Sequence, residues 1–511
     1  MDFQSTNAGQ TALREDHTGQ PVPIMGFDMG GEVFELDNRI LRGIYPEKGA
    51  LYHNVLQTCE KNDLFAAGII LTRKLNECLD LDLPYELVLE HARVPFVSYP
   101  HEWPASMLKA AAELHVRLFV ELGVHGLTIK DWHPYNILFE ATRPIFVDFC
   151  SIIPLAELPK EEYLTPPQVP VRFRRFWDTT SRYVWEMYRR MYIPYFLSPL
   201  LGMANQEHGK VRSRLFATTM NVANDYMSPM EVLSQRRLHR WRFAWWERVK
   251  RIALIDPSPT KRLFFHLLTR EIKNLTVAPA PSGYLDYYAA KGERFAFEPS
   301  EVWTRKQLVI YNVIRDERPS TLLDIGSNTG WFSILAARMG CQVVALDIDE
   351  SCANELYTKA EADELPILPL VMDISNPTPS LWPAKHMSNL PHWIVRTNTP
   401  VLLAAEQRFK CDMVLALAIV HHLTLGLGLS LDRVSQLLSL YTVKTLVAEF
   451  VSIEDRLIAD NPTFFTAFAA DPTVAQGYTL GNFIEILSRY FTTVAVQESS
   501  PDSRTIVICH R

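Results

Sequence analysis

The feature that most constrains the fold of this chain is an alternation of short apolar runs and helical segments between residues 321 and 451. Five of the runs look like strands: TLLDIG, QVVALDID, ILPLVMDI, DMVLALAI and TLVAEFV. The segments WFSILAARMG and ESCANELYTKAEA lie between the first three runs and have helical periodicity. Strands that alternate with helices indicate βαβ units, whose parallel sheet is covered by helices on both faces. We therefore predict a Rossmann-like α/β domain with a mainly parallel sheet in residues 281–511.

The first of these units predicts where a ligand binds. Residues 321–325 form the expected strand, residues 326–330 a glycine-flanked turn and residues 331–339 the first helix. In an open α/β sheet the ligand lies at the carboxyl ends of the strands, where glycines let the backbone approach it. The turn reads GSNTG, so Asn328 stands where a dinucleotide-binding fingerprint has its second glycine. This departure argues against NAD or FAD.

Two carboxylates end the next two strands. Asp347 follows Gly326 by twenty-one residues, a spacing that suits a carboxylate accepting hydrogen bonds from ribose hydroxyls. Asp373 ends the third strand, where it could accept from the exocyclic amine of adenine, with Ile374 against the ring. A ligand with ribose and adenine but no phosphate tolerates the bulkier turn. S-adenosylmethionine is such a ligand.

The stretches LLDIGSNTGWFS, VVALDIDE and VMDIS resemble the first three motifs of class I S-adenosylmethionine-dependent methyltransferases. The resemblance implies that Asp324, Gly326 and Gly330 line the methionine end of the cofactor, that Asp347 binds the ribose and that Asp373 faces the adenine. The whole implied cofactor site consists of Asp324, Gly326, Ser327, Asn328, Gly330, Asp347, Ile348, Asp373 and Ile374. A Rossmann-like fold without a cofactor stays open as the alternative.

Catalytic side chains are expected at the ends of the fourth and fifth strands. His421 and His422 directly follow the fourth strand, and a neutral imidazole there could remove a proton from an attacking hydroxyl or amine. We favour His422; the alternative is that the pair caps the strand and bonds to backbone. Glu449 ends the fifth strand and could bind a polar group of the acceptor, or be satisfied by loop amides. No ligand spacing supports a metal site.

A second motif lies in the first half of the chain, in IKDWHPYNILFEATRPIFVDF. Asp131, Asn136 and Asp148 resemble the catalytic and metal-binding loops of the protein kinase and aminoglycoside phosphotransferase superfamily, in which an Asp is the base and an Asn and a second Asp hold magnesium. Ile129 stands at the position of the usual histidine, and neither a strand lysine nor a clear glycine-rich loop precedes the motif. We interpret the region as a degenerate kinase-like domain that positions an acceptor or packs against the methyltransferase domain, with active phosphotransfer as the alternative.

The order of IKDWHPYNILF, PIFVDFCSI, DIGSNTGWFS and LALAIVHHL resembles methyltransferase-like proteins related to the rhizobial nodulation protein NoeA. This resemblance implies a bacterial methyltransferase of a small molecule, either a secondary metabolite or a glycan precursor. We predict a flexible N-terminus in residues 1–20, a mainly helical, kinase-like α+β domain in residues 21–280 and the methyltransferase domain in residues 281–511. The punctuated stretch VAPAPSGY marks the boundary.

The segment from Gln235 to Arg251 has two main interpretations. It holds seven Lys or Arg against one Glu, interleaved with Trp241, Trp245 and other aromatic residues, which could stack bases and neutralise phosphates. An RNA methyltransferase is therefore an alternative function. We favour a packed helix, since the tryptophans share an apolar face at helical spacing and Lys and Arg stems often fringe such a face. Attachment to a membrane surface is a third alternative.

Composition limits the binding partners and the cellular compartment that we expect for this chain. The formal net charge of −7 makes the chain as a whole no obvious polyanion binder. Seven scattered cysteines without a CxxC pair favour a reducing compartment, and no run approaches the eighteen or so apolar residues of a membrane span. We expect a cytoplasmic enzyme without a transmembrane segment, with a small-molecule acceptor as partner and no assigned oligomeric state. A non-catalytic scaffold that only senses ligands is the alternative from another class.

Overall fold

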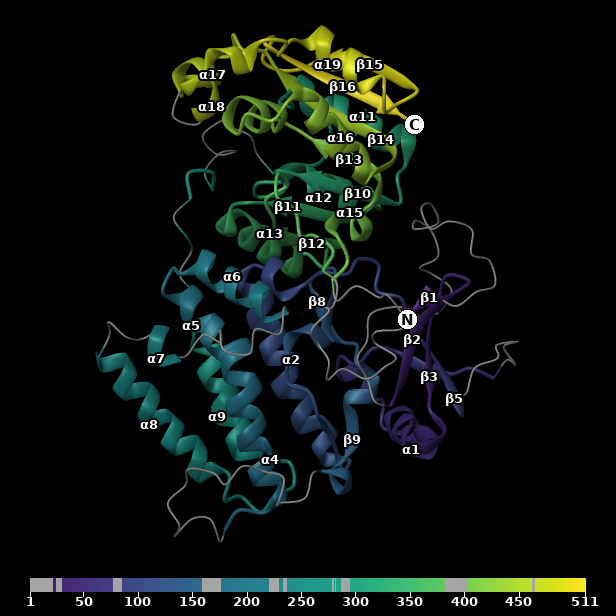
Figure 1. Cartoon of the computed structure of the whole chain (residues 1–511), viewed down its shortest axis with the longest axis vertical. Coiled ribbons are helices and arrows are strands. Elements are labelled where there is room, and N and C mark those ends of the chain that lie inside the picture. The colour runs from purple at the N-terminus through teal and green to yellow at the C-terminus, as the bar shows by residue number, and fades with distance from the viewer. Residues whose placement is uncertain are drawn as a thin grey trace. The chain divides into compact units, whose positions relative to one another are not determined.

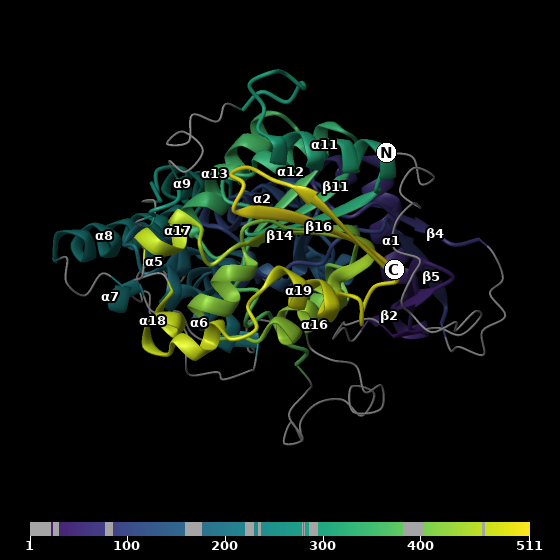
Figure 2. The same ribbon diagram turned by 90° about the horizontal axis from the view of Figure 1, so that it is seen from above.

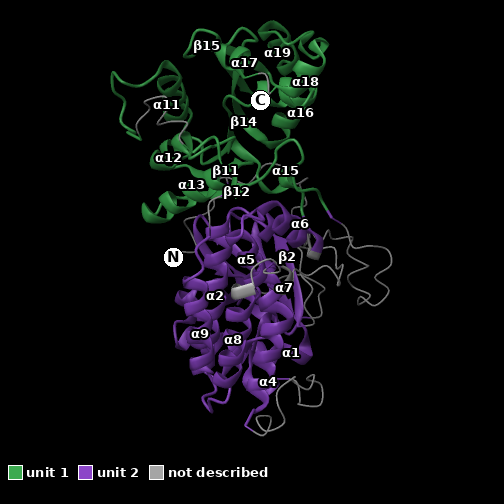
Figure 3. Ribbon diagram, turned by 90° about the vertical axis from the view of Figure 1, so that its left-hand side faces the viewer, with its two compact units in different colours: residues 1–14, 281–380, 403–511 green, residues 15–280, 381–402 purple. Residues whose placement is uncertain are grey.

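The computed structural model describes residues 22–23, 30–76, 85–158, 176–219, 229–232, 237–277, 280, 282–285, 295–381, 402–461 and 465–511. The expected flexible N-terminus, residues 1–20, lies outside the described residues. The chain divides into two compact units (Figure 3). Unit 1 comprises residues 1–14, 281–380 and 403–511, and unit 2 comprises residues 15–280 and 381–402. The domain boundaries proposed from the sequence stay a prediction.

Unit 1 is built on a seven-stranded sheet in the order β12-β11-β10-β13-β14-β16-β15 (Figure 1). The strands are β10 (Thr321–Ile325), β11 (Gln342–Asp347), β12 (Ile367–Val371), β13 (Cys411–Ala416), β14 (Thr442–Val451), β15 (Thr493–Glu498) and β16 (Arg504–His510). Within this sheet β10 to β14 are parallel, and β16 runs antiparallel to both β14 and β15. The strand order reverses between β10 and β13, and such a switch point is where open α/β sheets bind ligands.

The helices of unit 1 connect these strands. They are α11 (Arg305–Glu317), α12 (Trp331–Arg338), α13 (Glu350–Ala362), α15 (Ala405–Arg408), η8 (His422–Gly426), α16 (Leu431–Tyr441), α17 (Arg456–Asp460), α18 (Thr466–Ala470), η10 (Pro472–Ala475) and α19 (Leu480–Leu487). Side chains cap several of the starts: for example, Thr304 forms a capping box with Gln307 before α11, and Asp349 caps α13. The two helices predicted after the first and second strands are thus confirmed as α12 and α13.

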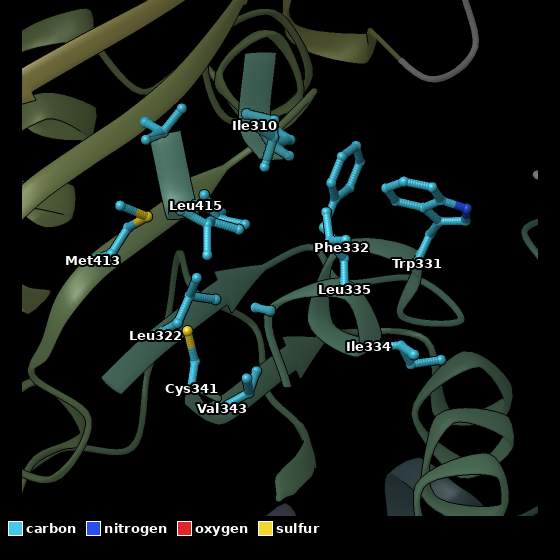
Figure 4. Close-up of a cluster of buried hydrophobic side chains, with 14 of the residues drawn as sticks. Ile310, Leu322, Trp331, Phe332, Ile334, Leu335, Cys341, Val343, Met413 and Leu415 are labelled. Carbon is cyan, nitrogen blue, oxygen red and sulfur yellow. The ribbon is translucent and has the colours of Figure 1, made fainter. Parts of the chain in front are cut away.

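The core of unit 1 locks the first βα unit in place (Figure 4). Leu322 from β10 and Leu415 from β13 are fully buried beside Trp331 and Leu335 of α12, and Ile310 of α11 joins the same cluster. Strands buried on both faces need such near-continuous apolar runs, which explains TLLDIG and DMVLALA. The packing holds α12 against the sheet and so positions the turn that precedes it.

Unit 2 begins with an antiparallel sheet in the order β1-β2-β3-β5-β4. Its strands are β1 (Val22–Pro23), β2 (Gly31–Leu36), β3 (Arg39–Ile44), β4 (Thr72–Lys74) and β5 (Leu87–His91). Helix α1 (Pro46–Lys61) connects β3 to β4 through the 3-10 turn η1 (Leu64–Ala67). The sequence pattern of this half of the chain, which is mainly helical in period, did not reveal this sheet. Its strands are short and only partly buried, so they leave a weak alternation of apolar and polar residues.

The rest of unit 2 is mainly helical. It contains η2 (Pro100–Glu102), α2 (Ala105–Val124), β6 (Leu127–Ile129), η3 (Pro134–Asn136), β7 (Ile137–Glu140), β8 (Arg143–Phe146), η4 (Phe149–Ser151), β9 (Ile152–Pro154), η5 (Leu155–Glu157), α4 (Thr179–Met187), η7 (Tyr188–Leu197), α5 (Ser198–Ala204), α6 (His208–Thr219), α7 (Pro229–Val232), α8 (Arg237–Ala253) and α9 (Arg262–Lys273). Figure 2 shows the helices from above. The α+β architecture expected for this region is therefore present. Within the described ranges, every helix is too short or too polar to cross a membrane.

Helix α8 corrects one interpretation of the sequence. The favoured packed helix would bury its tryptophans, yet the side chain of Trp241 is 66% exposed and that of Trp245 is 49% exposed. Lys250, a charged residue of the same helix, is fully buried. The packed-face interpretation is wrong for these two tryptophans, because the helix turns a different face towards the rest of unit 2.

Candidate cofactor and acceptor sites

The turn between β10 and α12 closes tightly at the end of the sheet. The amides of Gly326 and Ser327 both donate to the carbonyl oxygen of Leu346 in β11, at 2.8 and 3.1 Å. Gly326 and Gly330 have φ angles of +73° and +83°, which favour glycine. A Cβ atom on Gly330 would lie 2.3 Å from Cδ1 of Leu356 in α13. The second glycine is therefore required both by its backbone angle and by the close approach of α13.

Asp347, the candidate ribose ligand, is held by backbone amides. Its Oδ2 accepts from the amide of Asn328 at 2.7 Å, and its Oδ1 accepts from the amide of Asp349 at 2.8 Å. Burial raises the pKa of Asp347 to about 6. Each carboxylate oxygen keeps a further lone pair after these bonds, so the group can still accept from two hydroxyls. The neighbouring Ile348 is 67% exposed and forms an open apolar surface beside the carboxylate.

Asp324 lies beneath the same turn. It is buried, and its Oδ2 accepts from the Ser333 hydroxyl at 2.6 Å. Burial raises the pKa of Asp324 to about 6, and the charge of Asp347 adds to the shift, whereas Lys306 opposes it. The two carboxyls that the resemblance assigns to the methionine end and to the ribose of the cofactor therefore interact electrostatically across the turn.

The third candidate carboxylate, Asp373, lies two residues beyond the end of the neighbouring strand β12. Oδ1 of Asp373 accepts from both the amide and the hydroxyl of Ser375, at 2.8 and 2.6 Å. The amide of Met372 donates to the carbonyl oxygen of Asp347 at 2.8 Å, which ties this strand end to the ribose carboxylate. Ile374 is buried, so Ile348 rather than Ile374 presents the open apolar side chain.

Residues 282–285, in the punctuated stretch between the two halves of the sequence, contact this site. The side-chain amide of Asn328 donates to the carbonyl oxygen of Tyr284 at 3.1 Å. The hydroxyl of Ser282 donates to Oδ2 of Asp349 at 2.6 Å. The stretch interpreted as a boundary thus also borders the glycine turn, which its loop-like composition did not indicate.

The two histidines lie just past the end of β13. His421 is fully buried, and neither ring nitrogen has a hydrogen-bond partner in the described part of the chain. Burial, reinforced by His422 and Arg504, holds the pKa of His421 well below its usual value. His422 stacks on Phe465 with ring centroids 5.4 Å apart, and burial followed by Arg504 lowers its pKa. Both rings are therefore neutral near pH 7, the state in which imidazole accepts a proton.

Glu449 lies inside β14, two residues before the strand ends rather than at its end, and it is fully buried in an ion pair. Its Oε2 lies 2.7 Å from Nζ of Lys306, and its Oε1 accepts from the Ser499 hydroxyl at 2.9 Å. Burial alone would raise the pKa of Glu449, but Lys306 and then Arg504 hold it below its usual value. Glu449 is thus an ionised, side-chain-bonded carboxylate rather than one satisfied by loop amides.

The sequence did not identify the two cations of this site. Lys306 lies in the first turn of α11, and Arg504 begins β16, where its Nε is 2.9 Å from Oδ2 of Asp455. The T-x-x-Q capping box from Thr304 signals the start of α11. No local signal pairs Lys306 with Glu449, because 143 residues separate them.

The kinase-like residues of unit 2 converge on one short segment. The hydroxyl of Ser151 donates to Oδ2 of Asp131 at 3.1 Å, and the amide of Ser151 donates to the carbonyl oxygen of Asp148 at 3.0 Å. The amide of Val147 donates to the carbonyl oxygen of Asn136 at 2.9 Å. The buried side-chain nitrogen of Asn136 has no partner among the residues that the structure describes.

The carboxylate of Asp148 forms an ion pair with an arginine. Nη2 of Arg42 in β3 lies 3.2 Å from Oδ1 of Asp148, and Nε of Arg42 is 3.3 Å from Nε2 of His91. Burial, with Arg42 adding, holds the pKa of His91 well below its usual value, so this ring is neutral and accepts from the arginine. In the described ranges no group of three or more His, Cys, Asp or Glu side chains could hold a metal ion.

Comparison with known proteins supports the resemblance noted in the sequence. The chain is 26% identical over 391 residues to the nodulation protein NoeA of Rhizobium meliloti (strain 1021), which covers 75% of each protein. The chain is similar to NoeA. No family model matches it.

Several solved structures that are similar to part of this chain are methyltransferases. A putative O-methyltransferase from Nostoc punctiforme matches with 12% identity and a TM-score of 0.26, covering 40% of this chain and 55% of that one. Monomeric WbdD matches with 17% identity and a TM-score of 0.27, covering 41% of each chain. The magnesium protoporphyrin IX methyltransferase ChlM of Synechocystis, solved with bound SAH, matches with 16% identity and a TM-score of 0.27, covering 44% of this chain and 97% of that one. The chain thus covers about half or less of the length of the first two of these proteins.

Unit 1 has a Rossmann-like α/β fold with a mainly parallel sheet. The predicted C-terminal α/β architecture is confirmed, with its glycine turn at the end of the central strand.

Proposed function

We propose that unit 1 is a methyltransferase that uses S-adenosylmethionine. The observation that carries this proposal is the carboxylate of Asp347 at the end of β11, which two backbone amides fix beside the glycine turn and which the exposed Ile348 flanks. A carboxylate beside an open apolar side chain suits a ribose and its purine. Asn328 stands where the second glycine of a dinucleotide-binding turn lets the backbone approach a pyrophosphate, so the turn GSNTG is less suited to a phosphate. This donor set fits an adenosine without phosphates.

The proposed reaction methylates an oxygen or nitrogen of a small molecule, such as a secondary metabolite or a glycan precursor. S-adenosylmethionine, when bound, supplies an electrophilic methyl group. His422, neutral because of its burial, would take the proton from the attacking hydroxyl or amine. The carboxylate of Glu449, fixed by Lys306 and Ser499, would orient the acceptor. Positioning supplies most of the rate in such a transfer.

For unit 2 we propose a role in positioning the acceptor rather than in phosphotransfer. The supporting observation is that Arg42 already neutralises Asp148, the carboxylate that would hold a metal ion in an active kinase-like site. Asp131 and Asn136 remain as polar groups of this region, and the buried amide of Asn136 has an unused donor.

Calorimetric titration of the purified chain with S-adenosylmethionine, S-adenosylhomocysteine and, separately, Mg-ATP tests these proposals. We expect binding of the first two ligands, lost in Asp347→Ala and retained in the matched surface variant Asp316→Ala, whose side chain is 63% exposed and pairs with Arg315. Binding of Mg-ATP alone would overturn the proposal and move the chemistry to Asp131 and Asp148.

A labelled methyl donor with a panel of acceptors separates an enzyme from a scaffold. We expect His422→Ala to lower turnover by roughly 10²–10⁴-fold while cofactor binding persists. Normal turnover in this variant would exclude His422 as the base. Tight cofactor binding without transfer to any acceptor would favour the ligand-sensing scaffold.

A further inference from the structure

The inner side of helix α8 is clamped by a buried charge cluster. Nζ of Lys250, which is fully buried, lies 2.6 Å from Oε2 of Glu271 in α9 and 2.5 Å from Oε1 of Glu247, and it also bonds the hydroxyl of Tyr188. Next to Lys250 in the same helix, the guanidinium of Arg251 lies 5.0 Å from the centroid of the Trp185 ring in α4. These contacts fix the rotation of α8 about its axis. They therefore determine which residues of the helix face away from the rest of unit 2.

The outer side of α8 is both aromatic and basic. Trp241, Trp245, Arg248 and Ile252 are spaced by four, three and four residues, which places them on one helical face, and all four are exposed. The side chain of Ile252 is 57% exposed, comparable to the two tryptophans. Arg240 and Arg242 are also exposed and flank this stripe. We call the three apolar and three basic side chains the α8 face; α8 lies at the margin of unit 2 in Figure 1.

The charge of this face contrasts with that of the chain. The whole protein carries a net charge of −7, yet the α8 face presents three arginines and no exposed acid of its own helix, since Glu247 bonds Tyr188 and Lys250. A helix with Trp and aliphatic side chains on its outer stripe and arginines at the fringe matches the composition of interfacial helices. Indole rings favour the headgroup region, and arginines favour anionic headgroups.

Two other occupants fit the α8 face less well. RNA would use free aromatic faces, whereas Trp245 is stacked on Trp246 with centroids 5.6 Å apart and Ile252 offers no ring. A second copy of this chain, packed by a two-fold axis on the same face, would bring the arginines of both copies together. Anionic lipid complements both the charge and the apolar stripe.

We propose that the α8 face docks unit 2 on the surface of an anionic phospholipid membrane. Trp241, Trp245 and Ile252 enter the headgroup region, and Arg240, Arg242 and Arg248 contact lipid phosphates. The helix lies along the surface and does not cross it. This docking is independent of the proposed methyl transfer in unit 1.

Vesicle co-sedimentation of the full chain tests this proposal. We expect binding to vesicles of phosphatidylcholine with one-third phosphatidylglycerol, weak binding to phosphatidylcholine alone, and release by salt. The triple variant Arg240→Gln, Arg242→Gln, Arg248→Gln should lower the partition coefficient on the order of a hundredfold, since each basic residue near an anionic surface contributes a factor of about five. Trp241→Ala with Trp245→Ala should lower it roughly tenfold or more.

A matched control and two further measurements complete the test. Val302→Ser removes a comparably exposed apolar side chain from unit 1 and should leave vesicle binding unchanged. The α8 variants change exposed side chains, so their thermal unfolding should match that of the parent. Equal binding to neutral and anionic vesicles, or none to either, would overturn the proposal. Two other results would also overturn the proposal: binding of a mixed-sequence RNA in an electrophoretic shift assay, or a dimer in sedimentation. In either case the α8 variants would abolish that RNA binding or dimer but leave vesicle binding intact.

Discussion

Gly330 offers the sharpest test of the geometry around the proposed cofactor turn. Replacing it by alanine imposes two separate costs. The first is backbone strain, because φ is +83° and a left-handed conformation costs a residue with a Cβ about 1–2 kcal/mol. The second is steric: the new Cβ would lie 2.3, 2.8 and 3.0 Å from three carbon atoms of Leu356, well inside the ordinary contact distance of about 3.5–4.0 Å. Overpacking of this kind costs about 1–3 kcal/mol.

Gly340 separates these two costs. Its φ angle is +96°, and nothing lies within 4 Å of a Cβ built on it. Gly340→Ala should therefore lower the free energy of unfolding by the strain alone, about 1–2 kcal/mol. Gly330→Ala should lower it by about 2–5 kcal/mol in total. The excess corresponds to a melting temperature roughly 3–9 °C below that of Gly340→Ala for a unit of this size.

Scanning calorimetry of the full chain measures both variants, and Leu356→Ala provides the decisive background. Once the leucine is shortened, the clash disappears and Gly330→Ala should cost no more than Gly340→Ala. The coupling energy between positions 330 and 356 should then be about 1–3 kcal/mol. Equal costs of Gly330→Ala in both backgrounds would refute the argument that α13 limits the turn.

Three further predictions concern charges. Because burial raises the pKa of Asp347 to about 6, the carboxyl gains its proton as the pH falls through that value. The ionised fraction drops from about one half at pH 6 to about one eleventh at pH 5, so S-adenosylhomocysteine binding followed by calorimetry should weaken about fivefold over this range; a flat profile would show that ionised Asp347 is not the ribose ligand. Lys306→Met leaves Glu449 charged and buried, so chemical denaturation should show a loss of about 3–5 kcal/mol, which Glu449→Gln in the same chain should partly restore; an unchanged midpoint would contradict the ion pair. Lys250→Met should likewise destabilise unit 2 by about 3–5 kcal/mol, and adding Glu271→Gln should recover part of that loss.

The local parts of the fold and of the candidate site could be predicted from the sequence. Strand β10, the glycine turn and helices α12 and α13 each depend on neighbouring residues: an apolar run, glycines with positive φ and a capping Asp349. The position of Asp347 at the end of β11 followed from the same logic, because a strand end is set by the run before it, and Asp373 lies two residues past the end of β12. Which cofactor or acceptor these side chains bind stays a prediction.

The tertiary structure alone decided how distant segments meet. The insertion of β16 between β14 and β15 and the pairing of Lys306 with Glu449 depend on contacts between residues far apart in the chain, for which no local pattern exists. The orientation of α8 was decided in the same way. Its sequence has apolar residues on more than one side, and burial of Lys250 against Glu271 of α9 turned Trp241 outward. A helix's own periodicity shows that it has faces, but its neighbours determine which face is buried.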